Sequence, residues 1–296
     1  MNVRAVGIVG GGTMGQGIAV ACSAAGLDVL LRERSPEAAR EALERISEIL
    51  DHDIAKWRRT ESEKKAILAR VRTVASYSEL EAAQFVIEAV PEDLELKTAI
   101  FQELDRVCPP EDILATNTSA LSVSEIASRT GRPDRILGLH FLAPVPAVPL
   151  VEVVRGLSTS DQTFRDALEF VRVLGKTGIE VFEYPGYVTT RVILPFINEA
   201  MYVVMEGVAT AEAVDTSMRL GYGMPVGPLA LADRMGLDEV MRWMQHLFDE
   251  LGDLKYRPCP LLRKMVRARR LGVKSGSGFF EYDEHGVRKA GEGRRA

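Results

Sequence analysis

The glycine spacing near the N-terminus is the feature that most restricts the fold. Gly10, Gly12 and Gly15 form the pattern G-x-G-x-x-G directly after a short apolar run, Val6–Val9, and open an apolar helical stretch that closes at Gly26. In such a turn the first glycine permits the bend, the second lets the backbone approach a pyrophosphate, and the third lets the helix pack close to the strand. The helix N-terminus adds amide donors and a positive dipole end. The pattern predicts a strand, a turn and a helix that bind a dinucleotide.

An acidic residue past the second predicted strand strengthens this interpretation. Glu33 lies about 18 residues beyond Gly15, where a carboxylate can accept hydrogen bonds from the ribose hydroxyls of an adenosine. Such a carboxylate repels a 2′-phosphate and favours NAD, although Arg32 and Arg34 beside it could accommodate that phosphate. The alternative is a tight strand-to-helix turn with a surface glutamate. We predict NAD as the cofactor.

The first part of the chain alternates short β-branched runs with helical stretches, which is typical of a parallel, doubly wound sheet. We expect an α/β, Rossmann-like domain over residues 1–185. An insertion at residues 36–72 carries Leu43, Ile46 and Leu50 at helical spacing, which predicts a helical hairpin. The predicted strands are Val6–Val9, Val29–Leu31, Thr73–Ala75, Phe85–Ala89, Ile113–Thr116, Ile136–His140, Val151–Val154 and Ile179–Phe182.

Strand signals vanish in the last part of the chain, where glycine and proline punctuate helical stretches. We expect residues 186–296 to form an all-helical domain that serves dimerisation and substrate binding. Its first helix, around Val188–Glu206, is apolar on most sides, which is more than the core of one domain requires. The sequence therefore predicts a homodimer through this domain.

Composition excludes several classes of function. The formal net charge is -5, so general affinity for nucleic acid or anionic lipid is not expected. The 3 cysteines are far apart and show no C-x-x-C pair, which predicts neither a disulfide framework nor a metal site. We find no signal peptide and no membrane-spanning run, and together with the cysteines this favours the cytoplasm.

One of the 4 histidines lies where proton chemistry is expected. His140 ends a predicted buried strand at the carboxyl edge, where open α/β sheets place their ligands. The other three, His52, His246 and His285, lie in segments typical of the surface. Glu152 follows on the next strand, and a histidine polarised by a carboxylate is the usual device for removing a hydroxyl proton. A histidine on an apolar strand is often a satisfied core residue, but a dinucleotide site on the same sheet favours catalysis.

Motifs along essentially the whole chain resemble, in order, those of one known family. They are Gly10–Ala19, Asn117–Leu121, Gly138–Phe141, Pro144–Pro146, Leu150–Val153, Pro185–Tyr187, Met224–Pro228, Gly236–Asp238, Lys255–Pro258 and Lys274–Phe279. The family is the L-3-hydroxyacyl-CoA dehydrogenases, in particular the short, single-function members often called 3-hydroxybutyryl-CoA dehydrogenases. The resemblance implies a dimeric enzyme that uses NAD to oxidise an L-3-hydroxyacyl-CoA, of short chain length, to the 3-oxoacyl-CoA.

The same resemblance implies roles for individual residues. His140 is expected to be the general base, Glu152 its partner, and Ser119 a contact of the substrate's 3-oxygen and of the nicotinamide region. Lys56, in a basic run with Arg58, Arg59, Lys64 and Lys65, is the nominee for binding the CoA phosphates, although such runs are usually only solvated. The implied cofactor contacts are Gly10, Gly12, Thr13, Met14, Gly15, Glu33, Glu92, Lys97, Asn117, Ser119 and Lys274.

Several of these residues have simpler interpretations. Glu92 and Lys97 could be an exposed charge at a helix N-terminus and its solvated neighbour. Ser119 could hydrogen-bond its own loop, and Lys274 could be one more charge in a basic last helix.

Two positions depart from the family's pattern. Ala143 and Thr190 stand where asparagine is usual in the family. The second of these asparagines is expected near the reacting oxygen, where the hydroxyl of Thr190 can still donate one hydrogen bond. These departures leave two alternatives open. One is a dehydrogenase of the same superfamily that acts on a small hydroxy or sugar acid without CoA. The other is a non-catalytic NAD-binding or structural protein, against which His140, Ser119 and Glu152 argue.

Overall fold

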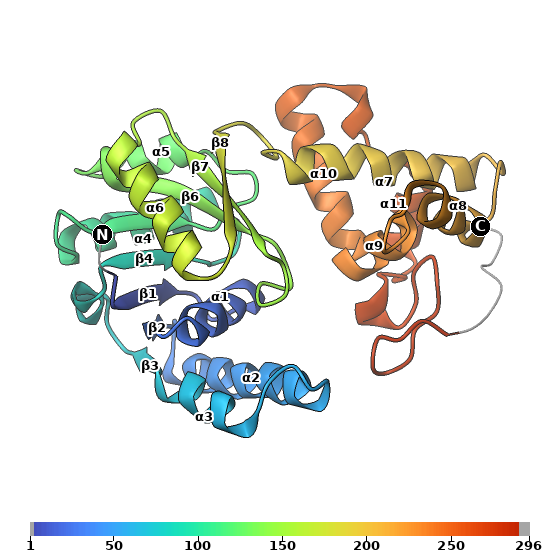
Figure 1. The fold of residues 1–296 in the computed structure, drawn as a ribbon. Helices are drawn as coiled ribbons and strands as arrows, with labels where there is room; N and C mark the ends of the chain where they lie inside the picture. The colour runs from blue at the N-terminus through green and yellow to red at the C-terminus, as the bar shows by residue number, and fades with distance from the viewer. Residues whose placement is uncertain (1–2, 290–296) are drawn as a thin grey trace. The chain divides into compact units, whose positions relative to one another are not determined.

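A computed structural model describes residues 3–289, and the chain divides into two compact units, Met1–Tyr187 and Val188–Ala296 (Figure 1). The first unit contains one eight-stranded sheet of order β3-β2-β1-β4-β5-β6-β7-β8. This is the Rossmann-like α/β fold that the sequence predicts. Its strands are β1 (Ala5–Val9), β2 (Asp28–Arg32), β3 (Val71–Val74), β4 (Phe85–Glu88), β5 (Ile113–Thr116), β6 (Ile136–Phe141), β7 (Leu150–Arg155) and β8 (Thr177–Phe182).

One pairing departs from the parallel, doubly wound sheet that the sequence predicts. β6 and β7 run antiparallel, with His140 opposite Glu152, whereas the other neighbouring strands are parallel. The connection between them, residues 142–149, is the physical reason, because a parallel crossover needs about a dozen residues or more. The sheet therefore reverses direction beside the predicted catalytic histidine.

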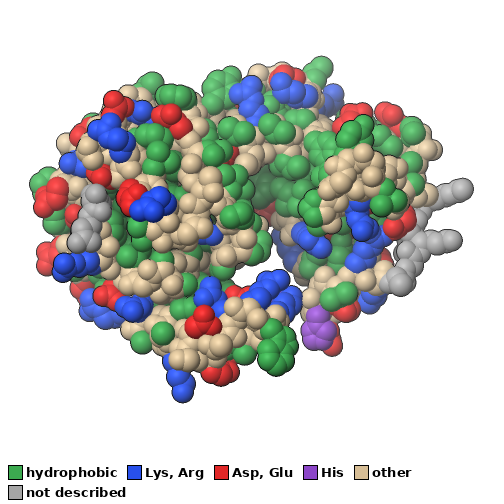
Figure 2. All heavy atoms as spheres, in the orientation of Figure 1, with side chains coloured by type: hydrophobic (Ala, Val, Ile, Leu, Met, Phe, Trp, Pro, Cys, Tyr) green, Lys and Arg blue, Asp and Glu red, His purple; other side chains and the backbone are tan. Residues whose placement is uncertain are grey.

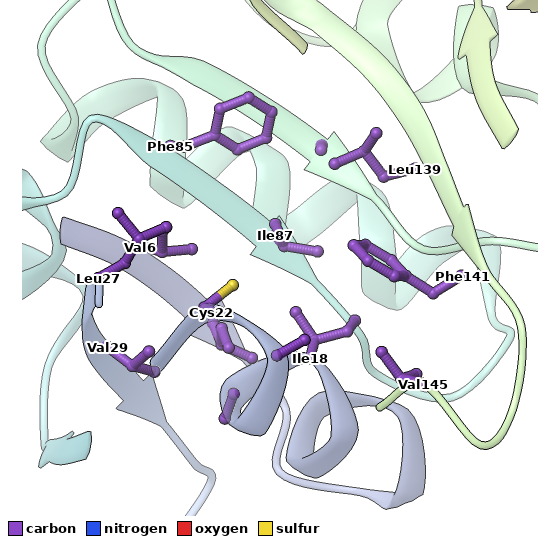
Figure 3. Packing of buried hydrophobic residues seen from close by; sticks show 14 of the residues in the cluster. Val6, Ile18, Cys22, Leu27, Val29, Phe85, Ile87, Leu139, Phe141 and Val145 are labelled. Carbon is purple, nitrogen blue, oxygen red and sulfur yellow. The ribbon is translucent and has the colours of Figure 1, made fainter. Parts of the chain in front are cut away.

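Helices cover both faces of this sheet. One face packs against α1, α2, α3 and α6, and includes a stacked pair, Phe85 on β4 and Phe170 on α6, with ring centroids 4.3 Å apart. Figure 3 shows part of this cluster, where Ile18 of α1 lies near Ile87 and Phe141 of the sheet. The other face packs against α4, α5 and the short 3-10 helix η1. The bounds are α1 (Thr13–Ala24), α2 (Pro36–Ala55), α3 (Glu61–Ala69), η1 (Tyr77–Ala82), α4 (Leu94–Val107), α5 (Val123–Ser128) and α6 (Asp161–Val173).

The predicted hairpin insertion is confirmed as α2 and α3, and its helices begin at side-chain caps. The Ser35 hydroxyl accepts a hydrogen bond from Ala38 N at 3.2 Å, with Pro36 in the first turn of α2. Thr60 and Glu63 form a capping box at the start of α3. Such caps satisfy backbone N–H groups that have no partner inside the helix.

The second unit is helical and ends in a bridged tail. Its helices are α7 (Thr189–Met205), α8 (Ala211–Tyr222), α9 (Pro228–Met235), α10 (Leu237–Leu251) and α11 (Pro260–Arg267). After α11, isolated β-bridges such as Gly272 to Ser277 fold the chain back. Buried Asp233 on α9 holds this tail by accepting hydrogen bonds from Phe279 N at 2.9 Å and from the Tyr282 hydroxyl at 3.0 Å. Within residues 3–289, no helix is long and apolar enough to cross a membrane.

Candidate functional site

Strand alternation brings polar side chains together at the carboxyl edge of the sheet. Along β4, β5 and β6 the residues two apart share a face, so Glu88, Thr116 and His140 lie on the face that carries Val86, Leu114 and Ile136 under α4 and α5. Glu152 of β7 pairs directly with His140 and lies on that face too. Open α/β sheets bind their ligands at this edge.

The central pair is an imidazole bonded to a buried carboxylate. His140 Nδ1 lies 2.5 Å from Glu152 Oε2, and both side chains are buried. A carboxylate only accepts hydrogen bonds, so this contact fixes the neutral tautomer with hydrogen on Nδ1 and a lone pair on Nε2. Nε2 is therefore the atom of this imidazole that can accept a proton, and a carboxylate bonded to Nδ1 would stabilise the imidazolium that results.

A second buried charge network lies beside this pair. Lys97 of α4 donates from Nζ to Glu88 Oε1 at 2.7 Å and to Val90 O at 3.2 Å, and Glu92 Oε2 lies 3.4 Å away. Thr116 Oγ1 donates to the other oxygen of Glu88 at 2.8 Å. Burial raises the pKa of Glu88, and Lys97 opposes that rise. The interpretation of Lys97 as a solvated charge is wrong: it is fully buried, and its three ammonium hydrogens have three acceptors nearby.

Glu92 organises the loop that follows β5. Its Oε1 accepts hydrogen bonds from the Thr118 hydroxyl and, at 3.0 Å, from Ser119 N. Asn117 Oδ1 accepts from Phe141 N at 3.0 Å, which ties the loop to the end of β6. The Ser119 hydroxyl has no hydrogen-bond partner among residues 3–289, so the interpretation that it bonds its own loop is wrong; Thr118 does so instead. Ser119 is thus held by its backbone with its hydroxyl available.

The glycine turn leaves room for a pyrophosphate. Gly10 has φ +100°, and a Cβ built on Gly15 would lie 1.8 Å from Gly10 O, so neither position tolerates a side chain. A Cβ on Gly12, the N-cap of α1, would meet nothing within 4 Å. The first turn of α1, with exposed Thr13 and half-buried Met14, carries no acidic residue. A helix N-terminus with open space and no negative charge fits the pyrophosphate of NAD.

Glu33 follows β2 and points back to this turn. Its Oε1 accepts a hydrogen bond from Gly11 N, and its Oε2 accepts one from Arg34 N at 2.9 Å. The carboxylate is therefore fixed beside the turn, where ribose hydroxyls of a bound adenosine can reach it. The Arg32 guanidinium lies 4.2 Å from the centroid of the Tyr77 ring. Because Tyr77 belongs to η1, this cation–π contact holds the Arg32 side chain against η1.

Thr190 and Lys274 belong to the second unit. Thr190 is half-buried in the first turn of α7. Lys274 lies in a short 3-10 turn, η4 (Val273–Ser275), and its Nζ is 2.6 Å from Asp238 Oδ2. The interpretation of Lys274 as a charge in a last helix is therefore wrong. Ala143 is exposed in the connection between β6 and β7.

The basic run of the hairpin is partly neutralised by its own acids. Arg58 and Arg59 both pair with Asp53, at 3.8 and 3.4 Å, and Lys64 Nζ lies 2.5 Å from an oxygen of Asp51. Figure 2 shows blue and red side chains next to each other over this hairpin. Lys56 is exposed and forms no ion pair with any residue that the structure describes.

Sequence reasoning gave no role to three residues that help to form this site. Glu88 and Thr118 anchor the charge network and the loop, and the ring of Tyr187 lies 5.5 Å from that of His140. Glu88 had a recognisable signal, because an acidic residue at the carboxyl end of a buried strand needs a partner. His246, expected at the surface, is half-buried, and its Nε2 has no partner within residues 3–289.

A glycine turn for a dinucleotide and a carboxylate-bound imidazole on one sheet edge define the class of protein: an NAD-dependent dehydrogenase that acts on CH–OH groups. Residues 5–184 match the family model described as 3-hydroxyacyl-CoA dehydrogenase, NAD binding domain, and residues 186–282 match that of its C-terminal domain. The chain belongs to the 3-hydroxyacyl-CoA dehydrogenase family.

Relatives match along nearly the whole chain. A Bacillus subtilis protein named "Probable 3-hydroxybutyryl-CoA dehydrogenase" is 49% identical over 96% of this chain and 99% of its own length. The 3-hydroxybutyryl-CoA dehydrogenase of Clostridioides difficile is 42% identical over 94% of this chain and 99% of its own. The crystal structure of (S)-3-hydroxybutyryl-CoA dehydrogenase PaaH1 from Ralstonia eutropha superposes with a TM-score of 0.88 at 43% identity, covering 96% of this chain and all of that one.

Two glycine substitutions separate folding from cofactor binding. Gly15→Ala should lower the melting temperature by several degrees, because its methyl group meets Gly10 O and the turn must open. Gly12→Ala should melt like the wild type, since the space is open and φ is -70°, yet weaken NADH binding by tenfold or more, on the order of 1.4 kcal/mol. Thermal melts and isothermal titration calorimetry measure the two effects. Equal loss of stability in both variants would contradict this division.

Removal of the buried cation should destabilise the first unit. Lys97→Met leaves Glu88 buried without its charge partner, which should lower the free energy of unfolding by about 3–5 kcal/mol. Urea unfolding measures the change. The exposed Lys65→Met should alter stability by no more than about 0.5 kcal/mol, and Glu88→Gln combined with Lys97→Met should recover part of the loss. A Lys97→Met protein as stable as the wild type would refute the structural role.

Proposed function

We propose that this enzyme reversibly oxidises short-chain L-3-hydroxyacyl-CoA esters, such as 3-hydroxybutyryl-CoA, to 3-oxoacyl-CoA. The observation that carries the proposal is the bond between His140 Nδ1 and Glu152, at the sheet edge that also carries the glycine turn. The short chain length is supported by the names of relatives that match over nearly their full length.

In the oxidation direction, Nε2 of His140 takes the proton of the 3-hydroxyl group as C3 becomes a carbonyl. Glu152 keeps its hydrogen bond to Nδ1 and stabilises the imidazolium, so the histidine does not rotate away. Bound NAD supplies the acceptor for the hydride that leaves C3. The Ser119 hydroxyl donates to the oxygen at C3, and the same is proposed for Thr190. Because the pair is buried, its electrostatic effect is larger than it would be in water.

The remaining binding roles follow the chemistry of each group. Glu33 accepts from the adenosine ribose, and the amides at the start of α1 face the pyrophosphate. Glu92 and Asn117 hold the loop that carries Ser119 against the cofactor, with Lys97 fixing Glu92. Direct contacts of Lys97 and Lys274 with NAD remain predictions. Lys56, exposed and unpaired within residues 3–289, is proposed to bind CoA phosphate.

Replacement of the base tests the mechanism. His140→Ala should lower kcat/KM for acetoacetyl-CoA and NADH between about a hundredfold and ten-thousandfold, while NADH still binds with wild-type affinity. Steady-state assays and calorimetry measure the two quantities, and the exposed His285→Ala is the matched control. An unchanged rate in His140→Ala would overturn the mechanism. Turnover of acetoacetate or a sugar acid, without turnover of acetoacetyl-CoA, would overturn the assignment of a CoA ester as the substrate.

We further propose a cytoplasmic homodimer formed by the second unit. Apolar side chains of its helices face solvent in the single chain: Val192 of α7 is 66% exposed, and Leu220 and Tyr222 of α8 are 81% and 80% exposed. Such side chains are stabilised when a partner covers them.

Sedimentation velocity should give a dimer for the wild type. The double variant Leu220→Asp/Tyr222→Asp should shift it toward monomer, because a carboxylate buried in an apolar interface is costly. Leu157→Asp, at a 94% exposed position of the first unit, should stay dimeric. A monomeric wild type would refute the proposal.

A further inference from the structure

Tyr187 is packed against the catalytic pair in an uncommon backbone conformation. Its ring centroid lies 5.5 Å from that of His140, at an interplanar angle of 56°. The residue is 5% exposed and has φ +47°, directly after Gly186 with φ +78°. Left-handed backbone at a bulky residue is rare outside sites that require it. The chain is therefore held in a position that presents this side chain to His140.

The hydroxyl group of Tyr187 lacks a partner. Its oxygen is shielded from water and makes no hydrogen bond with any residue from 3 to 289. Buried hydroxyl groups nearly always have one, and a phenylalanine would pack against the imidazole equally well without the cost of an unpaired polar atom. The hydroxyl therefore points to an acceptor that comes from outside the chain.

The groups around Tyr187 keep its hydroxyl protonated, so that it can act as a hydrogen-bond donor. Burial, together with the carboxylates of Glu92, Glu183 and Glu152, raises the pKa of Tyr187 well above its ordinary value. Each carboxylate already accepts another hydrogen bond: Glu92 from Ser119 N, Glu183 from Ser124 N at 3.1 Å, and Glu152 from His140. The phenol thus stays protonated over the working pH range, and the acidic groups around it are engaged elsewhere.

We propose that the Tyr187 hydroxyl donates a hydrogen bond to the thioester carbonyl of the acyl-CoA while His140 exchanges the proton at C3. This inference rests on the proposed function. The oxygen at C3 must meet Nε2 of His140 and is assigned the Ser119 hydroxyl as a donor, which leaves the thioester oxygen, two carbons away, for the Tyr187 hydroxyl. A substrate whose C3 lies against His140 also lies beside the Tyr187 ring. A small side-chain rotation, of the kind common on ligand binding, brings the Tyr187 hydroxyl to the thioester oxygen.

The test is Tyr187→Phe, which removes only the hydroxyl. The value of kcat/KM for acetoacetyl-CoA with NADH should fall between about tenfold and a hundredfold. NADH affinity should not change, because the cofactor does not use this donor. The melting temperature should stay the same or rise, since the lost group has no partner in the free protein. A structural hydroxyl would instead lower the melting temperature when removed.

Tyr256→Phe is the matched control. Tyr256 is also buried with an unpartnered hydroxyl, but it lies in the core of the second unit. Its kcat/KM should stay within about twofold of the wild type.

A carbonyl-free analogue tests the assigned oxygen. In S-(3-oxobutyl)-CoA a methylene replaces the thioester carbonyl, so the penalty of Tyr187→Phe should disappear with this substrate. Persistence of the full penalty would overturn the assignment to that oxygen. A Tyr187→Phe enzyme within twofold of the wild type on acetoacetyl-CoA, or one that loses activity only together with thermal stability, would overturn the inference. A wild type inactive on acetoacetyl-CoA would instead refute the proposed function.

Discussion

The antiparallel pairing of β6 and β7 is the constraint on which the site depends. It places His140 directly opposite Glu152, and side chains alternate between faces along a strand, so a slip of one residue would send one of the pair to the opposite face. Lys176 helps to fix the connection, because its Nζ donates to Val145 O at 2.6 Å and to Val148 O at 2.7 Å. The geometry of the imidazole is thus set by backbone register and by a cation that holds the turn, before any ligand binds.

The buried charges of the site are tolerated because they satisfy one another. Glu88 and Lys97 neutralise each other, and Lys97 also steadies Glu92, which holds the loop of Ser119. Asn117 connects that loop to β6 and so to His140. Linked hydrogen bonds in a low-dielectric interior strengthen each other and rigidify the groups they join. The groups expected to bind cofactor and to move the proton therefore share one preorganised network.

The sequence predicted those features that follow from local pattern. Glycine spacing, strand alternation and the periodicity of the hairpin depend on neighbours in the chain, so the turn at Gly10 and the helices α2 and α3 were predictable. The antiparallel reversal was missed because strand runs carry no direction by themselves. The burial of Lys97 was missed because a lysine four residues after the N-cap Asp93 looks solvated until a distant carboxylate, Glu88, is placed beneath it. That the Tyr187 hydroxyl has no hydrogen-bond partner within residues 3–289 can be recognised only from the three-dimensional structure.

Strand order explains why the loops after β4 and β5 carry so much of the site. The glycine turn follows β1 and the proposed base, His140, lies on β6, with β4 and β5 between them in the sheet. Neighbouring strands are about 4.8 Å apart, so three steps separate the pyrophosphate site from the base by roughly 14 Å. A dinucleotide bound at the β1 turn, as proposed, would have to cross these two strand ends to bring its reactive ring to His140. Glu92 and Ser119 follow these two strands, and the hydrogen bond from Ser119 N to Glu92 Oε1 anchors the loop that such a cofactor would pass.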